Sequence, residues 1–157
     1  MTVETWPLAP ASTDDSATSP IVSSFTTHLP GAHWALHASR TWTRRMVTIL
    51  GWHANVQSAV EVVSRLVDNG VKHGIPDTVP VFKRQLTLTV AITESGSLLI
   101  DVADMESVFP DFEAAVRGEK GRGLWQVARL GAQVTCFLPH EAGKTVRAVL
   151  SPGSVDL

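Results

Sequence analysis

The hydrophobic pattern of this chain changes from a helical period to a strand period near residue 80, and that order restricts the fold more than any other feature. Before this point, apolar residues recur every three or four positions over 35–49 and again over 56–71, which predicts two amphipathic helices. Beyond it, apolar and polar residues alternate over 85–93 and over 98–102, with a turn at 94–97, which predicts an antiparallel hairpin.

Shorter segments complete the pattern. We expect a strand over 21–28, a short helix or lid over 111–117, a helix over 124–130 and a final hairpin over 132–150. Two long helices ahead of a sheet indicate an α+β protein, built as a two-layer α/β sandwich with helices on one face of a mostly antiparallel mixed sheet.

The 157 residues suit one folded domain, which we place at residues 21–150. Residues 1–20 are rich in Ser, Thr, Pro, Ala and Asp, so they are expected to form a flexible tail, and 151–157 a second short tail.

Charge and composition argue against several classes of function. The formal net charge is −2 and no run of like charges occurs, which argues against direct binding of nucleic acid or of an anionic membrane. No apolar run approaches the ~20 residues that span a bilayer. Cys136 is the only cysteine and the start of the chain does not resemble a secretory signal, so a cytoplasmic location is expected.

Three polar features are candidates for chemistry. Arg65, Asn69 and His73 are spaced four apart, so they line one face of the second helix. Gly121-Arg122-Gly123-Leu124 precedes a helical pattern, where free N–H groups attract phosphate. Asp104 ends a strand, where a carboxylate can accept a hydrogen bond from an adenine amino group. Each has a plain structural alternative: a solvated helix face, a tight connection and a turn aspartate.

Two other patterns are set aside. Gly143-Lys144-Thr145 is not a phosphate loop, because the required earlier glycine falls at Leu138 and a strand pattern follows, so a hairpin turn is expected. The six histidines form no helix-spaced pair, which argues against a histidine metal site.

The order of the motifs adds to their separate weight. Along the chain the order is Leu29-Pro30-Gly31, then residues 64–74, then Val102-Ala103-Asp104, then Gly121-Arg122-Gly123-Leu124, then Gly143-Lys144-Thr145-Val146. Over residues 22–150 this arrangement resembles the histidine-kinase-like ATPase superfamily, which includes gyrase, Hsp90, histidine kinases and MutL. Within it, the chain is most similar to the small anti-sigma-factor serine kinases and ATP-binding regulators of actinomycetes.

The resemblance implies a Bergerat-type fold that binds ATP with Mg²⁺. Asn69 would hold the Mg²⁺, His73 would border the same site and Asp104 would contact adenine. A mobile lid would lie between Pro110 and Lys120. The remaining residues implied to line the nucleotide are Gly121, Arg122, Gly123, Leu124 and Thr145.

The chain departs from the family pattern at two positions. The family places a general-base Glu four residues before the Asn, where this chain has Arg65, and a guanidinium cannot accept a proton. Arg65 could contact a γ-phosphate or pair with Glu61, and Glu61 lies too far from Asn69 to act as the base. The second departure is Glu106, which adds bulk and negative charge near the expected adenine edge.

Three functions follow as alternatives. The first is an ATP-binding, anti-sigma-factor-like regulator that captures a sigma factor or an antagonist protein, with weak or absent kinase activity and no catalytic residue at position 65. The second is an active serine/threonine kinase that phosphorylates an anti-sigma-factor antagonist. The third is a protein-interaction module without nucleotide. The resemblance also implies that two copies can pair as a homodimer.

Overall fold

The computed structural model describes residues 19–106, 112–118, 123–137 and 143–152. Their elements run from Ile21 to Leu150 in an order close to the one predicted. In chain order they are β1 (Ile21–Pro30), α1 (Ala35–Ile49), α2 (Val56–His73), the 3₁₀ turn η2 (Val81–Lys83), β2 (Gln85–Thr93), β3 (Leu98–Ala103), α3 (Phe112–Val116), α4 (Gly123–Arg129), β4 (Gln133–Phe137) and β5 (Thr145–Leu150). The helices and strands expected from the periodicity are confirmed with small shifts of their ends, and η2 was not foreseen.

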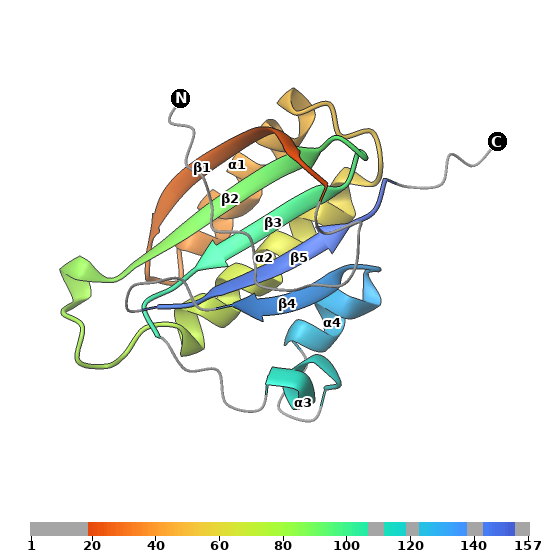
Figure 1. Ribbon diagram of the computed structural model, residues 1–157. Helices are drawn as coiled ribbons and strands as arrows, with labels where there is room; N and C mark the ends of the chain where they lie inside the picture. Colours follow the sequence, from red (N-terminus) through yellow and green to blue (C-terminus); the bar gives the residue numbers. More distant parts are fainter. Residues whose placement is uncertain (1–18, 107–111, 119–122, 138–142, 153–157) are drawn as a thin grey trace.

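The five strands form one sheet in the order β1-β2-β3-β5-β4, and each of the four pairings is antiparallel. The last strand, β5, therefore lies between β3 and β4. Helices α1 and α2 cover one face of the sheet, with α4 beside β4 (Figure 1). This arrangement confirms the predicted two-layer α+β sandwich, but the sheet of the described residues is antiparallel throughout and not mixed.

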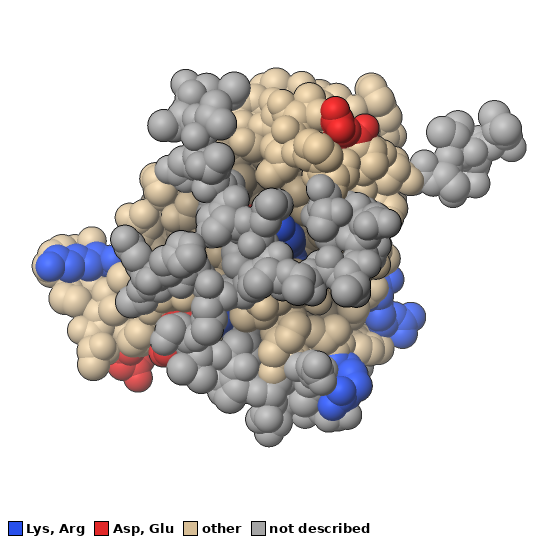
Figure 2. Space-filling model, in the orientation of Figure 1, with Lys and Arg blue, Asp and Glu red and all other residues tan. Residues whose placement is uncertain are grey.

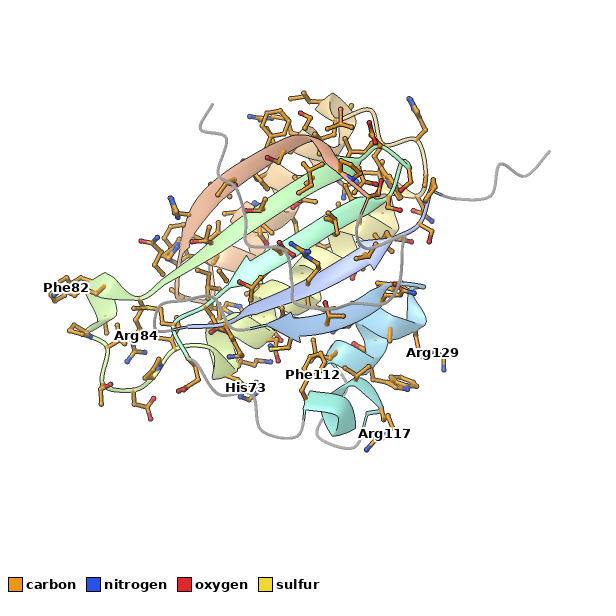
Figure 3. All side chains as sticks on the ribbon, viewed as in Figure 1. His73, Phe82, Arg84, Phe112, Arg117 and Arg129 are labelled. Carbon is orange, nitrogen blue, oxygen red and sulfur yellow. The ribbon has the colours of Figure 1, made fainter. Side chains whose placement is uncertain are left out.

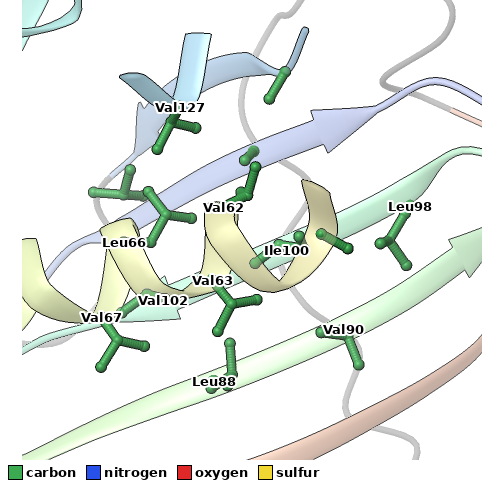
Figure 4. Packing of buried hydrophobic residues seen from close by; sticks show 14 of the residues in the cluster. Val62, Val63, Leu66, Val67, Leu88, Val90, Leu98, Ile100, Val102 and Val127 are labelled. Carbon is green, nitrogen blue, oxygen red and sulfur yellow. The ribbon is translucent and has the colours of Figure 1, made fainter. Parts of the chain in front are cut away.

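The core lies between α2 and the inner face of the sheet. Alternate residues of each strand point toward the helices, as the period of two requires. Figure 4 shows the valines and leucine of α2 against inner-face residues of β2 and β3. The labelled residues of this cluster are Val62, Val63, Leu66, Val67, Leu88, Val90, Leu98, Ile100, Val102 and Val127. Because β-branched residues are poor helix formers, this packing holds α2 in its helical form.

Both ends of α2 are held in place. At its start, the Asn55 side chain accepts a hydrogen bond of 3.1 Å from the Ser58 N–H, which caps the helix. Near its end, a Cβ on Gly70 would meet the methyl groups of Leu86 at 3.1 Å, so the glycine lets the helix approach the sheet closely. The Gly74 carbonyl then accepts a 2.8 Å hydrogen bond from the Met105 N–H. The end of α2 is thereby fastened to the chain just beyond β3.

The outer face of the sheet contains a buried ion pair between β3 and β5. Asp101 accepts two hydrogen bonds of 2.8 Å from Arg147, in a bidentate arrangement. Burial raises the pKa of Asp101, and the Arg147 guanidinium opposes that shift. A small apolar cluster on the same face consists of Ala91, Leu99 and Val149.

Two further observations concern the surface. In Figure 2, the Lys and Arg side chains of the described residues lie apart from one another, so they form no basic patch on the face shown. The turn η2 projects beyond the end of the sheet and carries Val81 and Phe82, which are 78% and 84% exposed (Figure 3). None of the helices in the described ranges has both the length and the apolar character to cross a membrane.

Candidate functional site

Helix α2 presents the predicted polar line. Arg65 and His73 are exposed, Asn69 is half-buried, and Figure 3 shows His73 at the end of the helix. Within the described ranges, the Asn69 amide makes no side-chain hydrogen bond, whereas its neighbour Asp68 forms a 3.0 Å ion pair with Lys72. The amide oxygen of Asn69 is therefore available to a ligand or a metal ion.

The carboxylate of Glu61 belongs to a contact between the two long helices. Its Oε1 lies 2.8 Å from Nη2 of Arg40 on α1, and it accepts a second hydrogen bond of 3.2 Å from Gln57. The hydrogen bond from Arg40 lowers the pKa of Glu61, while Arg65 adds only a longer-range attraction. The alternative in which Arg65 pairs directly with Glu61 is therefore wrong, because Arg40 is the partner. A carboxylate held in this way is a poor proton acceptor.

Asp104 lies directly beyond β3, and both of its carboxylate oxygens are engaged. Oδ2 is 2.8 Å from Nζ of Lys144, and Oδ1 accepts a 2.9 Å hydrogen bond from the Glu106 N–H. Nζ of Lys144 also donates to the Glu106 carbonyl at 3.1 Å. The Asp104 and Lys144 side chains are only 1% and 2% exposed. Burial raises the pKa of Asp104, and the hydrogen bond from Lys144 works against that shift.

The space around Asp104 is closed by two glycines. A Cβ on Gly74, at the end of α2, would lie 2.5 Å from Oδ2 of Asp104. A Cβ on Gly143 would overlap the Asp104 carbonyl oxygen. Both backbones can approach the aspartate this closely only because neither residue has a side chain. The carboxylate is thus surrounded by protein on the sides formed by α2 and by the start of β5.

Lys144 and Thr145 lie on opposite faces of the sheet. Thr145 pairs with Ala103 and Phe137, and alternation along β5 puts its side chain on the outer face with Arg147 and Val149. Its hydroxyl is buried and has no hydrogen-bond partner among the described residues. Lys144, one residue earlier, faces Asp104.

Sequence reasoning missed Lys144 because residues 143–145 were interpreted only as a turn. The sequence offered only the alternation of the last strand as a signal, and the contact with Asp104 follows from the structure, where the Asp104 N–H bonds to the Lys144 carbonyl. Counting back from Leu150 on the inner face reaches Lys144 by steps of two.

The predicted phosphate turn is only partly within reach of the structure. Gly121 and Arg122 lie outside the described residues, and of the expected lid only 112–118 is described. Gly123 is the first residue of α4, a helix of seven residues. Leu124 is 3% exposed and belongs to the hydrophobic core. The roles proposed for this turn remain predictions.

Comparisons with known proteins bear on the fold. No protein-family model matches the chain, and no curated protein matches its sequence. A chain with the RsbU and RsbW domains of Rv1364c from Mycobacterium tuberculosis matches with a TM-score of 0.60 and 17% identity, over 83% of this chain. This chain spans about a third of that longer one, 32% of its length. A chain of the SiaB–SiaC complex from Pseudomonas aeruginosa matches with a TM-score of 0.57 and 15% identity, over 87% of this chain and 93% of that one.

The chain therefore shares its fold with these two chains of known structure. The matches agree with the two-layer fold that the sequence predicted, and the ATP site implied by the resemblance stays a prediction. Whether this chain can bind ATP with Mg²⁺ depends on its own residues. On the phosphate side, the unengaged Asn69 amide is compatible with Mg²⁺, which prefers oxygen ligands. On the adenine side, the residues do not fit, because Asp104 is already bonded to Lys144 and enclosed by Gly74 and Gly143.

Proposed function

We propose that this chain is a regulator of the anti-sigma-factor type that binds a partner protein and does not transfer phosphoryl groups. Two observations support a protein partner. The fold is shared over nearly the full length of a chain from the SiaB–SiaC complex, which is an assembly of two proteins. It is also shared with a chain that carries an RsbW domain. The partner we propose is a sigma factor or an antagonist protein.

The observation that carries the proposal is that α2 has no carboxylate one turn before Asn69, where the resemblance implies the general base. The position one turn before Asn69 holds the exposed Arg65, and a guanidinium stays protonated at physiological pH. The nearest acidic residue toward the start of the helix, Glu61, is bound by Arg40 and has a lowered pKa. Loss of a general base costs about 10²–10⁴-fold in rate. A working serine kinase would need a base from elsewhere, which makes this alternative the weaker one.

The test separates binding from catalysis. The purified chain is mixed with a candidate antagonist protein or with a candidate sigma factor. Phosphoserine is measured with γ-labelled MgATP, and complex formation is measured by calorimetry. We expect a complex with the sigma factor or the antagonist and no phosphoserine. Phosphorylation by the wild-type chain would contradict the absence of catalysis, and the lack of a complex with either protein would contradict the regulatory role.

Arg65→Glu is the informative variant for this test. It restores a carboxylate at the position where the resemblance implies a base, without touching the buried core, because Arg65 is exposed. If position 65 is what limits catalysis, we expect phosphoserine to appear in this variant. The matched control is Arg44→Glu on α1, an exposed arginine away from Asn69, which should leave the reaction blank.

One observation favours ATP binding, which is part of the first of the three functions inferred from the sequence. The Asn69 amide is half-exposed and makes no side-chain hydrogen bond within the described ranges, so it could hold a Mg²⁺ that bridges phosphates. In this form of the proposal, MgATP should raise the melting temperature of the wild-type chain by ligand linkage, and Asn69→Ala should abolish the increase. Equal melting temperatures with and without MgATP would favour an interaction module that binds no nucleotide.

A further inference from the structure

The ion pair between Asp104 and Lys144 lies where the resemblance implies the adenine contact. An adenine amino group is a neutral donor that would need a free lone pair on the Asp104 carboxylate. In this chain the Lys144 ammonium donates to Oδ2 at 2.8 Å, and the Glu106 N–H donates to Oδ1 at 2.9 Å. The chain itself therefore supplies both donors that the carboxylate accepts from described residues.

The relative strengths of these donors favour the lysine over a base. Both an ammonium and an adenine amino group can donate to a carboxylate, but only the ammonium adds the attraction between opposite charges. A base that displaced the ammonium would leave Lys144, now 2% exposed, as an unpaired charge in a buried position, which is strongly unfavourable. The second bond of Lys144, to the Glu106 carbonyl, adds to the cost of moving it.

The backbone around the pair holds Asp104 and Lys144 in this arrangement. Gly74 and Gly143 approach the aspartate so closely that a single added carbon on either would overlap it. The Met105 N–H is bonded to the Gly74 carbonyl at 2.8 Å, which holds the end of α2 against this site.

We infer that Lys144 takes, with its ammonium, the hydrogen-bonding position on Asp104 that an adenine amino group would need, and so withholds adenine recognition from this chain. Lys144 is a specificity-determining residue: any nucleotide is held by its phosphates and Mg²⁺ at Asn69, and its base is not read by Asp104. This inference rests on the proposed function, because it takes Asn69 as the place where a nucleotide binds. It adds that such binding would not depend on the adenine base.

The experiment compares MgATP with MgITP, because the hypoxanthine base of ITP lacks the amino group. Calorimetric titration of the wild-type chain should give either no saturable binding or dissociation constants for the two nucleotides within about twofold, well under the tenfold that one lost hydrogen bond to a charged group implies. A wild-type preference for MgATP of about tenfold or more would overturn the inference.

Lys144→Ala removes the competing donor. We expect this variant to bind MgATP about tenfold or more tightly than the wild-type chain, and to prefer MgATP to MgITP. The direction of the change in MgATP affinity decides between two roles of Lys144. If the lysine merely attracted phosphate, its loss would weaken binding. Lys144→Arg keeps the charge and should behave as the wild type. Lys72→Ala is the matched control for loss of a lysine charge, since Lys72 is exposed and pairs with Asp68.

A second variant covers the case in which Lys144→Ala does not fold because Asp104 is left unpaired. The double variant Asp104→Asn/Lys144→Met removes both charges, and its amide oxygen can still accept from an adenine amino group. Circular dichroism shows which variants are folded. A folded variant of either kind that binds MgATP no better than the wild type would overturn the inference. The proposed function fails on different readouts, namely phosphoserine formation and absence of a partner complex.

Discussion

At the scale of single residues, the ion pair between Arg40 and Glu61 shows how the chain uses a carboxylate that stands near the expected catalytic position. It joins α1 to α2 and is about one-third exposed on each side. Its 2.8 Å hydrogen bond lowers the pKa of Glu61, which identifies it as a structural contact and not as a proton acceptor.

This contact predicts a pH-dependent difference between the wild-type chain and Glu61→Gln. Because the folded-state pKa of Glu61 lies below its ordinary value of 4.5, its stabilising contribution is present above that value and is lost as the pH falls through the folded-state pKa. We expect the variant to be less stable by about 0.2–1 kcal/mol at pH 7, as for other partly exposed ion pairs.

Urea unfolding at neutral pH and again below about pH 4 measures this difference. The gap between the two proteins should close at the acid pH. Gln57→Ala removes a neutral donor to the same carboxylate, so its smaller effect provides the control. A gap that stays unchanged in acid would show that Glu61 acts through packing and not through its charge.

At the scale of single elements, α2 is helical because of what it packs against. Seven of its residues are buried, and four of these are valines: Val60, Val62, Val63 and Val67. Valine is a poor helix former, and an isolated helix of this length is marginal in water even for good formers. The periodicity of apolar residues predicted the helix correctly, since periodicity reports the buried face and is independent of propensity.

We therefore expect a synthetic peptide covering residues 55–74 to be mostly unfolded in water. Its far-ultraviolet circular dichroism should show little helix, although the same residues form 18 residues of helix in the folded chain. A peptide in which Val62, Val63 and Val67 are replaced by Ala is the control and should be more helical, because alanine is the best helix former. Strong helicity of the natural peptide would mean that local preference, and not the sheet, determines α2.

At the scale of the whole molecule, the sheet is stabilised on both faces. The inner face packs on α2, and the outer face carries the bidentate pair of Asp101 and Arg147, of which the side chains are 4% and 6% exposed. Removing one partner of such a buried pair leaves the other charge unpaired. The resulting loss of stability is larger than the stability that the intact pair adds relative to apolar residues of the same size.

Arg147→Met should accordingly lower the free energy of unfolding by about 3–5 kcal/mol, since Asp101 is left buried without its partner. The double variant Asp101→Leu/Arg147→Met removes both charges and should recover most of this loss. Urea unfolding at neutral pH measures both proteins. Equal destabilisation of the single and double variants would mean that the pair matters for its packing and not for its charge.

The sequence was sufficient for the element order and for the two-layer architecture because hydrophobic period and turn residues are local signals. It was sufficient for the line of Arg65, Asn69 and His73 for the same reason. It could not reveal that Asp104 meets Lys144, since this contact joins residues 40 positions apart and depends on strand register and on the approach of Gly74. Nor could it show that Glu61 pairs with Arg40 on another helix and not with Arg65 on its own.

The position of β5 between β3 and β4 has a consequence for the synthesis of the chain. Strand β3 lacks the partner on its second side until Thr145 has been made, and 41 residues separate Ala103 from Thr145. At a translation rate of about 5–20 residues per second, this interval lasts roughly 2–8 s. During that time the apolar inner face of β3, with Ile100 and Val102, borders an open sheet edge on the nascent polypeptide. Ribosome-associated chaperones would therefore meet this chain at the unfinished β3 edge.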